Sequence, residues 1–597
     1  MSKNRNIIEG RILSFDKNTF NKDFDFSSLK IDKKRIFVTD GIIDSIEPVN
    51  FINPEFQDVE VTDYGDHLIS AGFVDAHVHY PQTAIIASWG KRLIDWLNIY
   101  TFPEEMRFKS LNYASEVAAR YIDFSLSNGT TTMASYCTIH PESVDAFFES
   151  AANKNMCVVG GKTCMDRNAP GDLCDTAKSA YDDSKALLQK WHQKGRAHYA
   201  ITPRFSPTST PDQLSALGSL WSEFPECLMQ THLSEQVDEI DWVRKLFPKA
   251  RDYLDTYEKF GLLGERGVYG HAIHLETREI DRLSDVGASL IHCPTSNTFI
   301  GSGLFDMKEL ASRSIQVGLA TDIGGGSSFS MLRTMAGAYE VAQLKGFALH
   351  PAQLMWLATK GSAKALHLDD KIGNLASGMA ADLVVLDLSS TPTISQRSAR
   401  ANDVWEELFP TIMMGDDRAF SKPYENPTAN DLNIFANYED DLDFADTTPI
   451  NSIAPRSLFN LEGCGGGNLS PKEAEQRFNK IISYALKLFT RGAQRGENNQ
   501  QVGPLLERLM ELEENEVKIS NMLATLVAGH DTTAYTMQYC LMELARNPDL
   551  QTRARAEVNK LYDEIESEGG GLDLVKNNYS VARVNHDCAK RHRVSID

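Results

Sequence analysis

Eight short apolar runs between residues 72 and 322 alternate with stretches of helical periodicity, and this alternation strongly limits the folds open to the chain. Runs that are apolar at consecutive positions are typical of strands buried on both faces, as in parallel sheets covered by helices. Eight strand–helix units predict an α/β fold of the (β/α)₈ TIM-barrel type, with functional residues at the carboxyl ends of the strands. The runs are "GFVDAHVH" (72–79), "GTTTMASY" (129–136), "CVVGGKT" (157–163), "AHYAITPRF" (197–205), "CLMQTHL" (227–233), "GVYGHAIHL" (267–275), "ASLIHCP" (288–294) and "QVGLATD" (316–322).

Short β-rich pieces flank the predicted barrel on both sides, and we expect them to combine into one small β-domain. An acidic stretch rich in Asn and Asp follows and then a "GCGGG" break, which together are typical of a linker. Helical periodicity dominates the rest of the chain. The predicted parts are the first part of the small β-domain (1–66), the barrel (67–368), the return to the small β-domain (369–418), the linker (419–469) and a mainly α-helical segment (470–597).

The composition limits the partners and the compartment. A formal net charge of -22 argues against nucleic acid or an anionic membrane as the main partner. The chain has no apolar stretch of membrane-spanning length, and its first residues lack the apolar core of a signal peptide. Nine cysteines occur without C-x-x-C spacing, which favours free, buried thiols over a disulfide framework. We therefore expect a cytoplasmic protein.

His77 and His79 stand at the end of the first predicted strand with one residue between them. Residues i and i+2 of a strand point to the same face, so both imidazoles can reach one metal ion. The pair alone is a weak signal, because histidines in strands are more often ordinary core or surface groups.

Further ligand-type residues stand at the ends of other predicted strands. His232 ends the fifth strand and Glu235 follows it, His271 lies at the end of the sixth, and Asp322 precedes a glycine-rich turn after the eighth. Each of these residues could instead have an ordinary structural role. An Asp before glycines, for example, is commonly a turn former. All of them at one barrel rim predict a catalytic metal site, which needs three or more such ligands and an open position.

Several segments in this order resemble the amidohydrolase superfamily and, within it, the guanine deaminase family, over residues 6–418. They are "GFVDAHVHYPQ", "GGKTCMDRNAP", "TPRFSPT", "HLSEQVDE", "GHAIHLE", "HCPTSN" and "VGLATDIGGGSSFSML". The resemblance implies one zinc ion bound by His77, His79, His232 and Asp322, although iron or manganese suits the same ligands. It also implies a homodimer.

The resemblance further implies a role for each remaining residue of the rim. Glu235 would be the proton shuttle, and His271 would hydrogen-bond the metal-bound water or the developing tetrahedral centre. Gln82, Arg204 and Phe205 would hold the purine, together with His232, Glu235 and His271.

The implied reaction is hydrolysis of guanine to xanthine and ammonia, by attack of a zinc-activated hydroxide on C2. Three alternatives stay open at this point. The chain could deaminate another purine, a pteridine or a triazine. It could combine a deaminase with a haem monooxygenase, or it could use the barrel as a non-catalytic scaffold.

"AGHDTTA" (528–534), continued by "LMELARNPDLQTRARAEV" (541–558), resembles the oxygen-activating helix of cytochrome P-450 monooxygenases. In that family Asp531 and Thr532 would relay protons to oxygen. Such enzymes bind haem through a cysteine thiolate in an F-x-x-G-type loop. Cys588, in "NHDCAKRHR", lacks that context. We therefore expect no haem and no monooxygenase function.

An absorption spectrum of the reduced, carbon monoxide-treated protein tests this expectation. We expect no Soret band at the position typical of thiolate-ligated haem, because no cysteine loop for the iron follows the helix. A strong band in protein supplied with haem would show that another cysteine serves as the ligand.

Overall fold

The computed structural model describes residues 3–90, 92–415, 419 and 434–435, and its largest element is a barrel of eight parallel strands. Neighbouring strands are hydrogen-bonded in chain order, and the last strand lies beside the first. Each of the eight predicted runs contains one strand, so the predicted (β/α)₈ barrel is confirmed. The strands are β5 (Phe73–Val78), β6 (Thr130–Tyr136), β7 (Cys157–Gly161), β9 (Ala197–Pro203), β10 (Leu228–Leu233), β11 (Gly267–His271), β12 (Ser289–His292) and β13 (Gln316–Leu319), with the two-residue β8 (Thr163–Cys164) beside β9.

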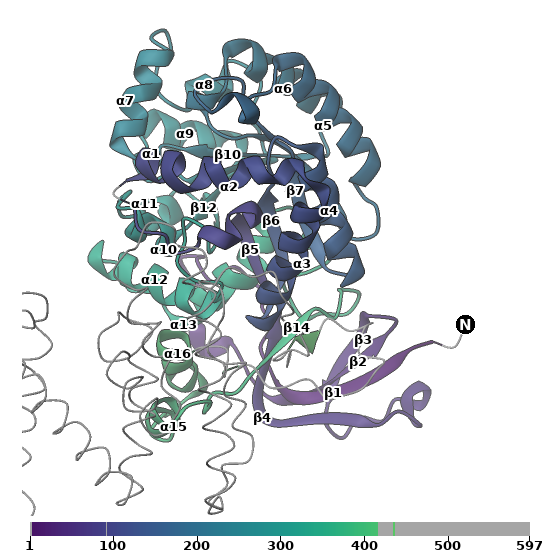
Figure 1. Cartoon of the computed structure of the whole chain (residues 1–597). Coiled ribbons are helices and arrows are strands. Elements are labelled where there is room, and N and C mark those ends of the chain that lie inside the picture. Colours follow the sequence, from purple (N-terminus) through teal and green to yellow (C-terminus); the bar gives the residue numbers. More distant parts are fainter. Residues whose placement is uncertain (1–2, 91, 416–418, 420–433, 436–597) are drawn as a thin grey trace, which may run out of the picture. The chain divides into compact units, whose positions relative to one another are not determined.

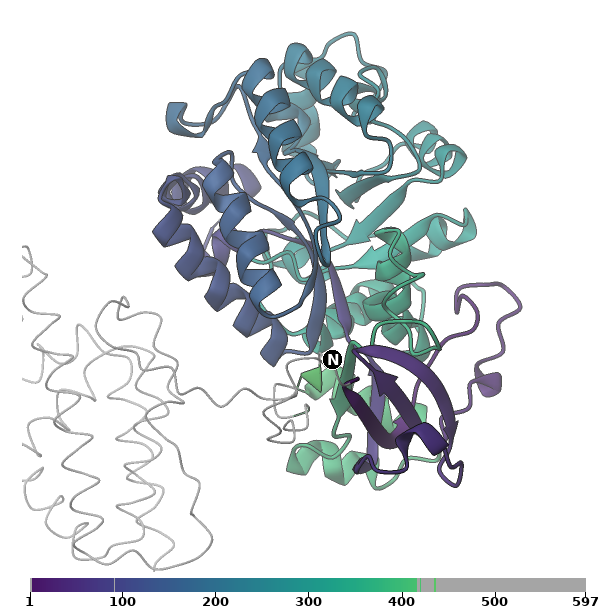
Figure 2. The same cartoon turned by 90° about the vertical axis from the view of Figure 1, so that its right-hand side faces the viewer.

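Helices surround these strands in Figures 1 and 2. The longer ones begin at local capping signals, such as the Thr176 side chain before α5 and Thr210 followed by Pro211 before α6. The helices are α1 (Leu93–Trp96), α2 (Phe102–Glu105), α3 (Leu111–Ser127), α4 (Pro141–Asn153), α5 (Ala177–Trp191), α6 (Pro211–Glu223), α7 (Val237–Leu246), α8 (Asp255–Glu258), α9 (Thr277–Val286), α10 (Pro294–Phe299), α11 (Met307–Ser312), α12 (Met331–Leu344), α13 (Pro351–Trp356), α14 (Ser362–Ala365), α15 (Pro392–Ser398) and α16 (Val404–Met414).

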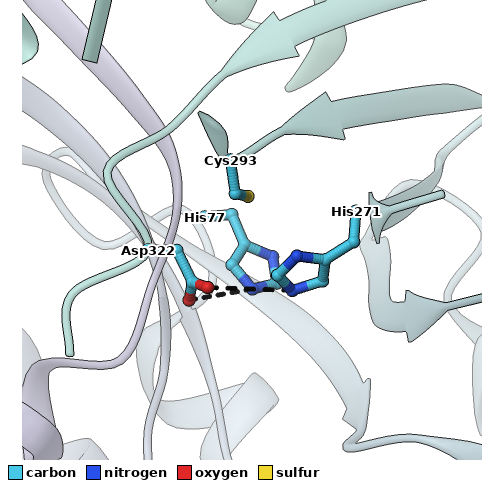
Figure 3. Close-up of side chains that lie close together, drawn as sticks. All are labelled: His77, His271, Cys293 and Asp322. Carbon is cyan, nitrogen blue, oxygen red and sulfur yellow. Dashed lines mark ion pairs between the residues drawn. The ribbon is translucent and has the colours of Figure 1, made fainter. Parts of the chain in front are cut away.

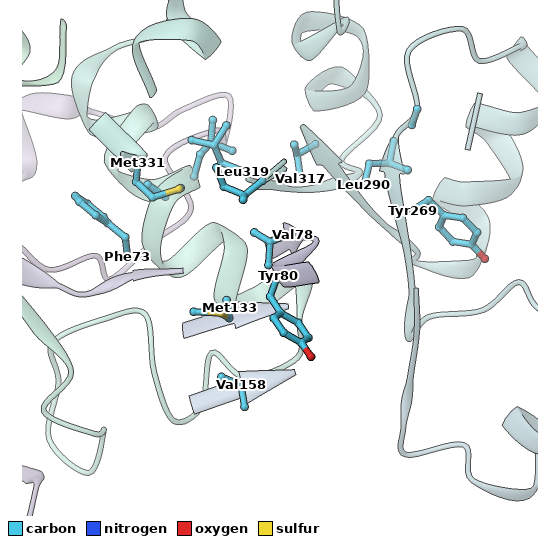
Figure 4. Packing of buried hydrophobic residues seen from close by; sticks show 14 of the residues in the cluster. Phe73, Val78, Tyr80, Met133, Val158, Tyr269, Leu290, Val317, Leu319 and Met331 are labelled. Carbon is cyan, nitrogen blue, oxygen red and sulfur yellow. The ribbon is translucent and has the colours of Figure 1, made fainter. Parts of the chain in front are cut away.

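The strands are apolar on both faces because each face packs into a different layer. Val158 and Leu290 belong to the layer between strands and helices, part of which is drawn in Figure 4. The next residues along the same strands, Val159 and Ile291, belong to the layer inside the barrel. Alternate side chains of a strand point to opposite faces, so a strand buried on both sides must be apolar at consecutive positions.

A six-stranded sheet beside the barrel takes strands from both ends of this region, which confirms the predicted small β-domain. Its order is β15-β14-β4-β1-β2-β3. The strands are β1 (Arg5–Ile12), β2 (Lys33–Thr39), β3 (Ile42–Pro48), β4 (Val61–Ala71), β14 (Leu383–Leu386) and β15 (Ile434–Phe435).

Two boundaries differ from the sequence interpretation. β4 crosses the predicted limit at residue 66, because residues 68–71 are buried and pair with β14 in the small sheet. β15 lies within residues 419–469, the predicted linker, and pairs with β14 through its backbone. The rest of that linker and the helical segment 470–597 lie outside the described residues. No helix of the described part is long and apolar enough to cross a membrane.

An ion pair joins the amino-terminal end of the barrel to the small sheet. Arg196, just before β9, donates two hydrogen bonds to the carboxylate of Asp382, just before β14, one of them at 2.9 Å. The Asp382 carboxylate is 4% exposed and the Arg196 side chain 22% exposed. Removing one partner of such a pair leaves the other charge buried without compensation.

We expect Asp382→Ala to lower the free energy of unfolding by roughly 3 kcal/mol, since it leaves the Arg196 guanidinium largely buried and unpaired. Thermal and urea unfolding followed by circular dichroism measure the loss. The control is Lys178→Ala, which breaks the exposed Lys178–Asp182 pair and should leave the midpoint close to that of the parent. Equal midpoints for both variants would contradict the assignment.

Candidate active site

Five ligand-type side chains from four separate strands meet at the carboxyl-terminal mouth of the barrel. His77 lies in β5 and His79 directly follows it, His232 lies in β10, His271 ends β11, and Asp322 follows β13. All five are buried. The structure therefore brings together side chains that are up to 245 positions apart in the chain.

The distances within this cluster are short enough for one small ion to touch several of its atoms. The Nε2 atoms of His79 and His232 are 3.1 Å apart. The Oδ1 atom of Asp322 lies 3.5 Å from Nε2 of His77 and 3.6 Å from Nε2 of His79. The Oδ2 atom lies 3.7 Å from Nε2 of His271. Figure 3 shows the Asp322 carboxylate facing the neighbouring rings of His77 and His271 from one side.

The donor atoms fit a metal cation. Burial, together with the neighbouring imidazoles, holds the pKa values of His77, His79 and His232 well below the usual value, so their rings are neutral. His232 donates its Nδ1 hydrogen to the backbone oxygen of Arg204 at 2.7 Å, which leaves the lone pair on Nε2 facing the cluster. The buried Nε2 of His77 has no hydrogen-bond partner among the described residues. Such converging lone pairs are what a cation needs.

His271 and Asp322 differ from the three neutral imidazoles. Burial lowers the pKa of His271, but the carboxylates of Glu235 and Asp322 outweigh it, and the net shift is upward. Burial raises the pKa of Asp322 to about 7, against the opposing effect of His271. The Nδ1 atom of His271 lies 2.8 Å from Oδ1 of Asn297, so it donates there and Nε2 faces the carboxylates. The charges of His271 and Asp322 therefore stabilise each other across 3.7 Å.

Glu235 lies at the edge of the same cluster. Its Oε2 atom is 3.7 Å from Nε2 of His271, and its Oε1 atom accepts a hydrogen bond from the Ser302 hydroxyl at 2.7 Å. Its backbone N–H donates to the carboxylate of Glu239 at 2.9 Å. These contacts hold the Glu235 carboxyl towards the histidines, where it can carry a proton.

A cavity opens over the cluster and contains about 400 Å³ of space free of protein atoms, including its solvent-facing mouth. The residues predicted to hold a purine, Gln82, Arg204 and Phe205, line it with His79, His232, Glu235, His271 and Asp322. Apolar side chains complete its wall: Leu93, Trp96, Leu97 and Ile300.

Comparison with known proteins places this arrangement in a family. The model of the amidohydrolase family matches residues 68–419, more than half of the chain. The chain belongs to the amidohydrolase family. A relative named guanine deaminase, from Escherichia coli strain K12, is 46% identical over 366 residues, which are 61% of this chain and 83% of the relative.

Solved structures agree with this membership. The structure of E. coli guanine deaminase superposes with a TM-score of 0.68 at 42% identity, and the match covers 70% of this chain and 98% of that one. Guanine deaminase from C. acetobutylicum, solved with bound guanine, has a TM-score of 0.64 at 29% identity, with 70% and 98% covered.

A second family model, cytochrome P450, matches residues 472–567. This range contains Asp531 and Thr532, the two residues singled out in the sequence. It agrees with the resemblance of that segment. Both residues lie outside the part of the chain that the structure describes.

Cys293 is a neighbour of the amidohydrolase cluster that the sequence interpretation left without a role. It lies close to His77, His271 and Asp322 in Figure 3. Burial holds the pKa of its thiol well above the usual value, and the side chain packs into the apolar layer inside the barrel. The thiol therefore stays protonated and lies beside the ligand-type side chains.

Glu105, Asn297 and Ser302 also contact site residues and were missed. Asn297 belongs to the "HCPTSN" segment that carried the resemblance, but nothing local in that segment indicates that its amide orients His271. Glu105 and Ser302 stand in segments without a motif. Their contacts link positions 23 to 99 residues apart, which a single sequence does not reveal.

Gly270, directly before His271, makes room for the His77 ring. A Cβ atom at this position would lie 2.5 Å from Cε1 and 2.7 Å from Nδ1 of His77, closer than non-bonded atoms approach. We expect Gly270→Ala to displace that imidazole and to lower metal retention at least about tenfold, as changes to residues that orient ligands do. Metal content after dialysis against a weak chelator measures it.

The matched control is Gly171→Ala, where the added Cβ has no atom within 4 Å. This variant should keep the metal content of the parent protein. Unchanged metal retention in a folded Gly270→Ala protein would show that His77 is not a ligand.

Proposed function

We propose that this chain is a zinc-dependent guanine deaminase, which hydrolyses guanine to xanthine and ammonia. The observation that carries the proposal is that Gln82, Arg204 and Phe205 line the same cavity as the cluster of ligand-type side chains. The relatives and solved structures named guanine deaminase, at up to 46% identity, support it. A homodimer is our inference from the family resemblance, and a location in the cytoplasm is our inference from the composition.

His77, His79, His232 and Asp322 are the residues that would hold the metal. Three imidazoles and one carboxylate are typical ligands of catalytic zinc, and iron or manganese is the alternative. When bound, zinc lowers the pKa of a coordinated water to about 7, so that hydroxide is available at neutral pH.

The side chains around that position would move the protons of the reaction. As the water oxygen adds to C2 of guanine, Asp322 takes up the water proton, and His271 orients the water from the other side. Glu235 gives a proton to the adjacent ring nitrogen. It then takes the proton of the hydroxyl now on C2, which becomes the carbonyl of the product, and passes that proton to the amine on C2. The bond between C2 and the amine nitrogen then breaks, and ammonia leaves, because a neutral amine is a far better leaving group than an amide ion. The proton held by Asp322 finally restores Glu235.

The remaining residues would hold the purine over the cluster. Arg204 donates hydrogen bonds to acceptor atoms on its polar edges, and Gln82 can donate and accept. Phe205 offers an aromatic face for the rings. A base with the wrong pattern would leave buried polar groups unpaired, which is a strong basis for selecting guanine.

Incubation of the zinc-replete protein with guanine tests the proposal, with xanthine and ammonia as the products measured. We expect Glu235→Gln to lower kcat about 10²- to 10⁴-fold, because the amide cannot shuttle a proton, while zinc content and guanine binding persist. Glu116→Gln, an exposed position on α3, is the control with parental activity.

Two results would contradict this proposal. The first is a folded, zinc-loaded protein that does not turn over guanine. The second is a panel of aminated pteridines and triazines in which one compound is converted in place of guanine.

A further inference from the structure

Glu105, the last residue of α2, is a buried carboxylate that contacts both polar residues of the predicted purine site. Its Oε1 atom accepts a hydrogen bond from Nε2 of Gln82 at 2.9 Å. Its Oε2 atom accepts one from the NH1 group of Arg204 at 2.7 Å. The residue is 1% exposed and is not among those that line the cavity. Glu105 therefore lies behind the site and acts on it through other side chains.

The contact with Glu105 determines which way the Gln82 amide faces. A primary amide can be turned by 180° so that its oxygen and nitrogen exchange places, but an ionised carboxylate only accepts hydrogen bonds. Gln82 must therefore turn its NH₂ group to Glu105. Its oxygen then accepts the backbone N–H of Gly324 at 3.3 Å, in the turn after Asp322. The hydrogen bonds to Glu105 and from Gly324 therefore require the same orientation of the Gln82 amide.

The same carboxylate compensates the charge of Arg204. The Arg204 side chain is only 4% exposed, and its guanidinium lies 5.7 Å from the centre of the Phe102 ring. A guanidinium has five N–H donors in one rigid plane, so fixing one nitrogen fixes the direction of the others. Glu105 takes one of these donors, and Arg204 also lines the cavity.

We propose that Glu105 is a positioning residue for the purine. It fixes the orientation of the Gln82 amide and the direction of the Arg204 guanidinium at the same time. It thereby presents a preformed pattern of donors and acceptors to the base without touching it. This inference rests on the proposed guanine deaminase activity.

Glu104 provides a matched comparison one residue away. It is also a buried carboxylate of α2, but it accepts hydrogen bonds from Arg107, at 3.0 Å, and from the hydroxyl of Tyr113. Neither partner lines the cavity. Replacing either Glu104 or Glu105 by Gln therefore removes one carboxylate charge from α2. The two variants differ in whether they change the contacts with Gln82 and Arg204.

Glu105→Gln tests the proposal, because an amide at this position has one oxygen for two donors and turns its own NH₂ group towards one of them. We expect the KM for guanine to rise about 10- to 100-fold, as for small misplacements of binding groups. The value of kcat should stay within a few-fold, with zinc content and the shape of the pH profile unchanged. This pattern is that of an interaction used equally for the bound substrate and the transition state. Glu104→Gln should keep the parental KM.

A complementary pair of variants separates positioning from loss of folding. Gln82→Glu places two carboxylates in contact and should raise KM, whereas the double variant with Glu105→Gln restores one donor and one acceptor between the two positions. We expect the rise in KM of the double variant to be smaller than the product of the rises in the two single variants, because the effects of substitutions at residues in contact are not additive. It also supplies a second protein if Glu105→Gln alone does not fold.

The outcomes distinguish this inference from the proposed function. If the parent protein does not convert guanine, the proposed function fails whatever the variants do. If the parent is active, three results would overturn the role of Glu105. They are an unchanged KM in folded Glu105→Gln, a fall in kcat alone, and multiplicative effects in the double variant.

Discussion

The site depends on one electrostatic arrangement, in which the lone pairs of buried imidazoles converge on the Asp322 carboxylate. Nε2 of His79 and Nε2 of His232 face each other at 3.1 Å, an arrangement that costs free energy without a cation between them. Hydrogen bonds with the backbone hold members of the cluster in this arrangement. The backbone oxygen of Arg204 orients His232, and the Asp322 N–H donates to the backbone oxygen of His77 at 3.0 Å.

Closure of the barrel and assembly of the cluster of ligand-type side chains use the same contacts. Asp75 in β5 accepts hydrogen bonds from the backbone N–H of Thr321 at 2.9 Å and from its hydroxyl at 2.5 Å. Asp75 precedes His77 by two residues, and Thr321 directly precedes Asp322. These two hydrogen bonds, which join the first strand to the segment after the last, therefore also set the distance between His77 and the Asp322 carboxylate. A barrel that closed with another register would separate them.

Much of this arrangement could be predicted from the sequence, because the signals are local. Eight runs apolar at consecutive positions predict strands buried on both faces, and ligand-type residues at their ends predict a rim site. The limit at residue 66 was wrong for a physical reason. β4 ends at Ala71 and β5 begins at Phe73, so the chain passes from the small sheet into the barrel without a turn. Only Gly72 lies between them, where a Cβ would clash with Thr131 of β6. No turn signal exists there for a sequence-based boundary to use.

The roles of Glu105 and Ser302 could not be predicted, because they depend on contacts between distant segments. The structure explains why such contacts matter, since the residues proposed to hold the purine are joined to the proposed metal ligands by hydrogen bonds to backbone oxygens. Arg204 accepts the Nδ1 hydrogen of His232 with its backbone oxygen, while its side chain is held by Glu105. The backbone N–H of Gln82 donates to the backbone oxygen of His79 at 2.9 Å.

A shift of either His79 or His232, the proposed metal ligands, would therefore move a proposed purine contact with it. Under the proposed function, the two hydrogen bonds at the backbones of Arg204 and Gln82 would help to set the position of the base over the cluster. This coupling accounts for the placement of a buried carboxylate behind both residues. Because the backbones of Gln82 and Arg204 are held by these hydrogen bonds, only their side chains could still turn. The hydrogen bonds to Glu105 would restrict that motion.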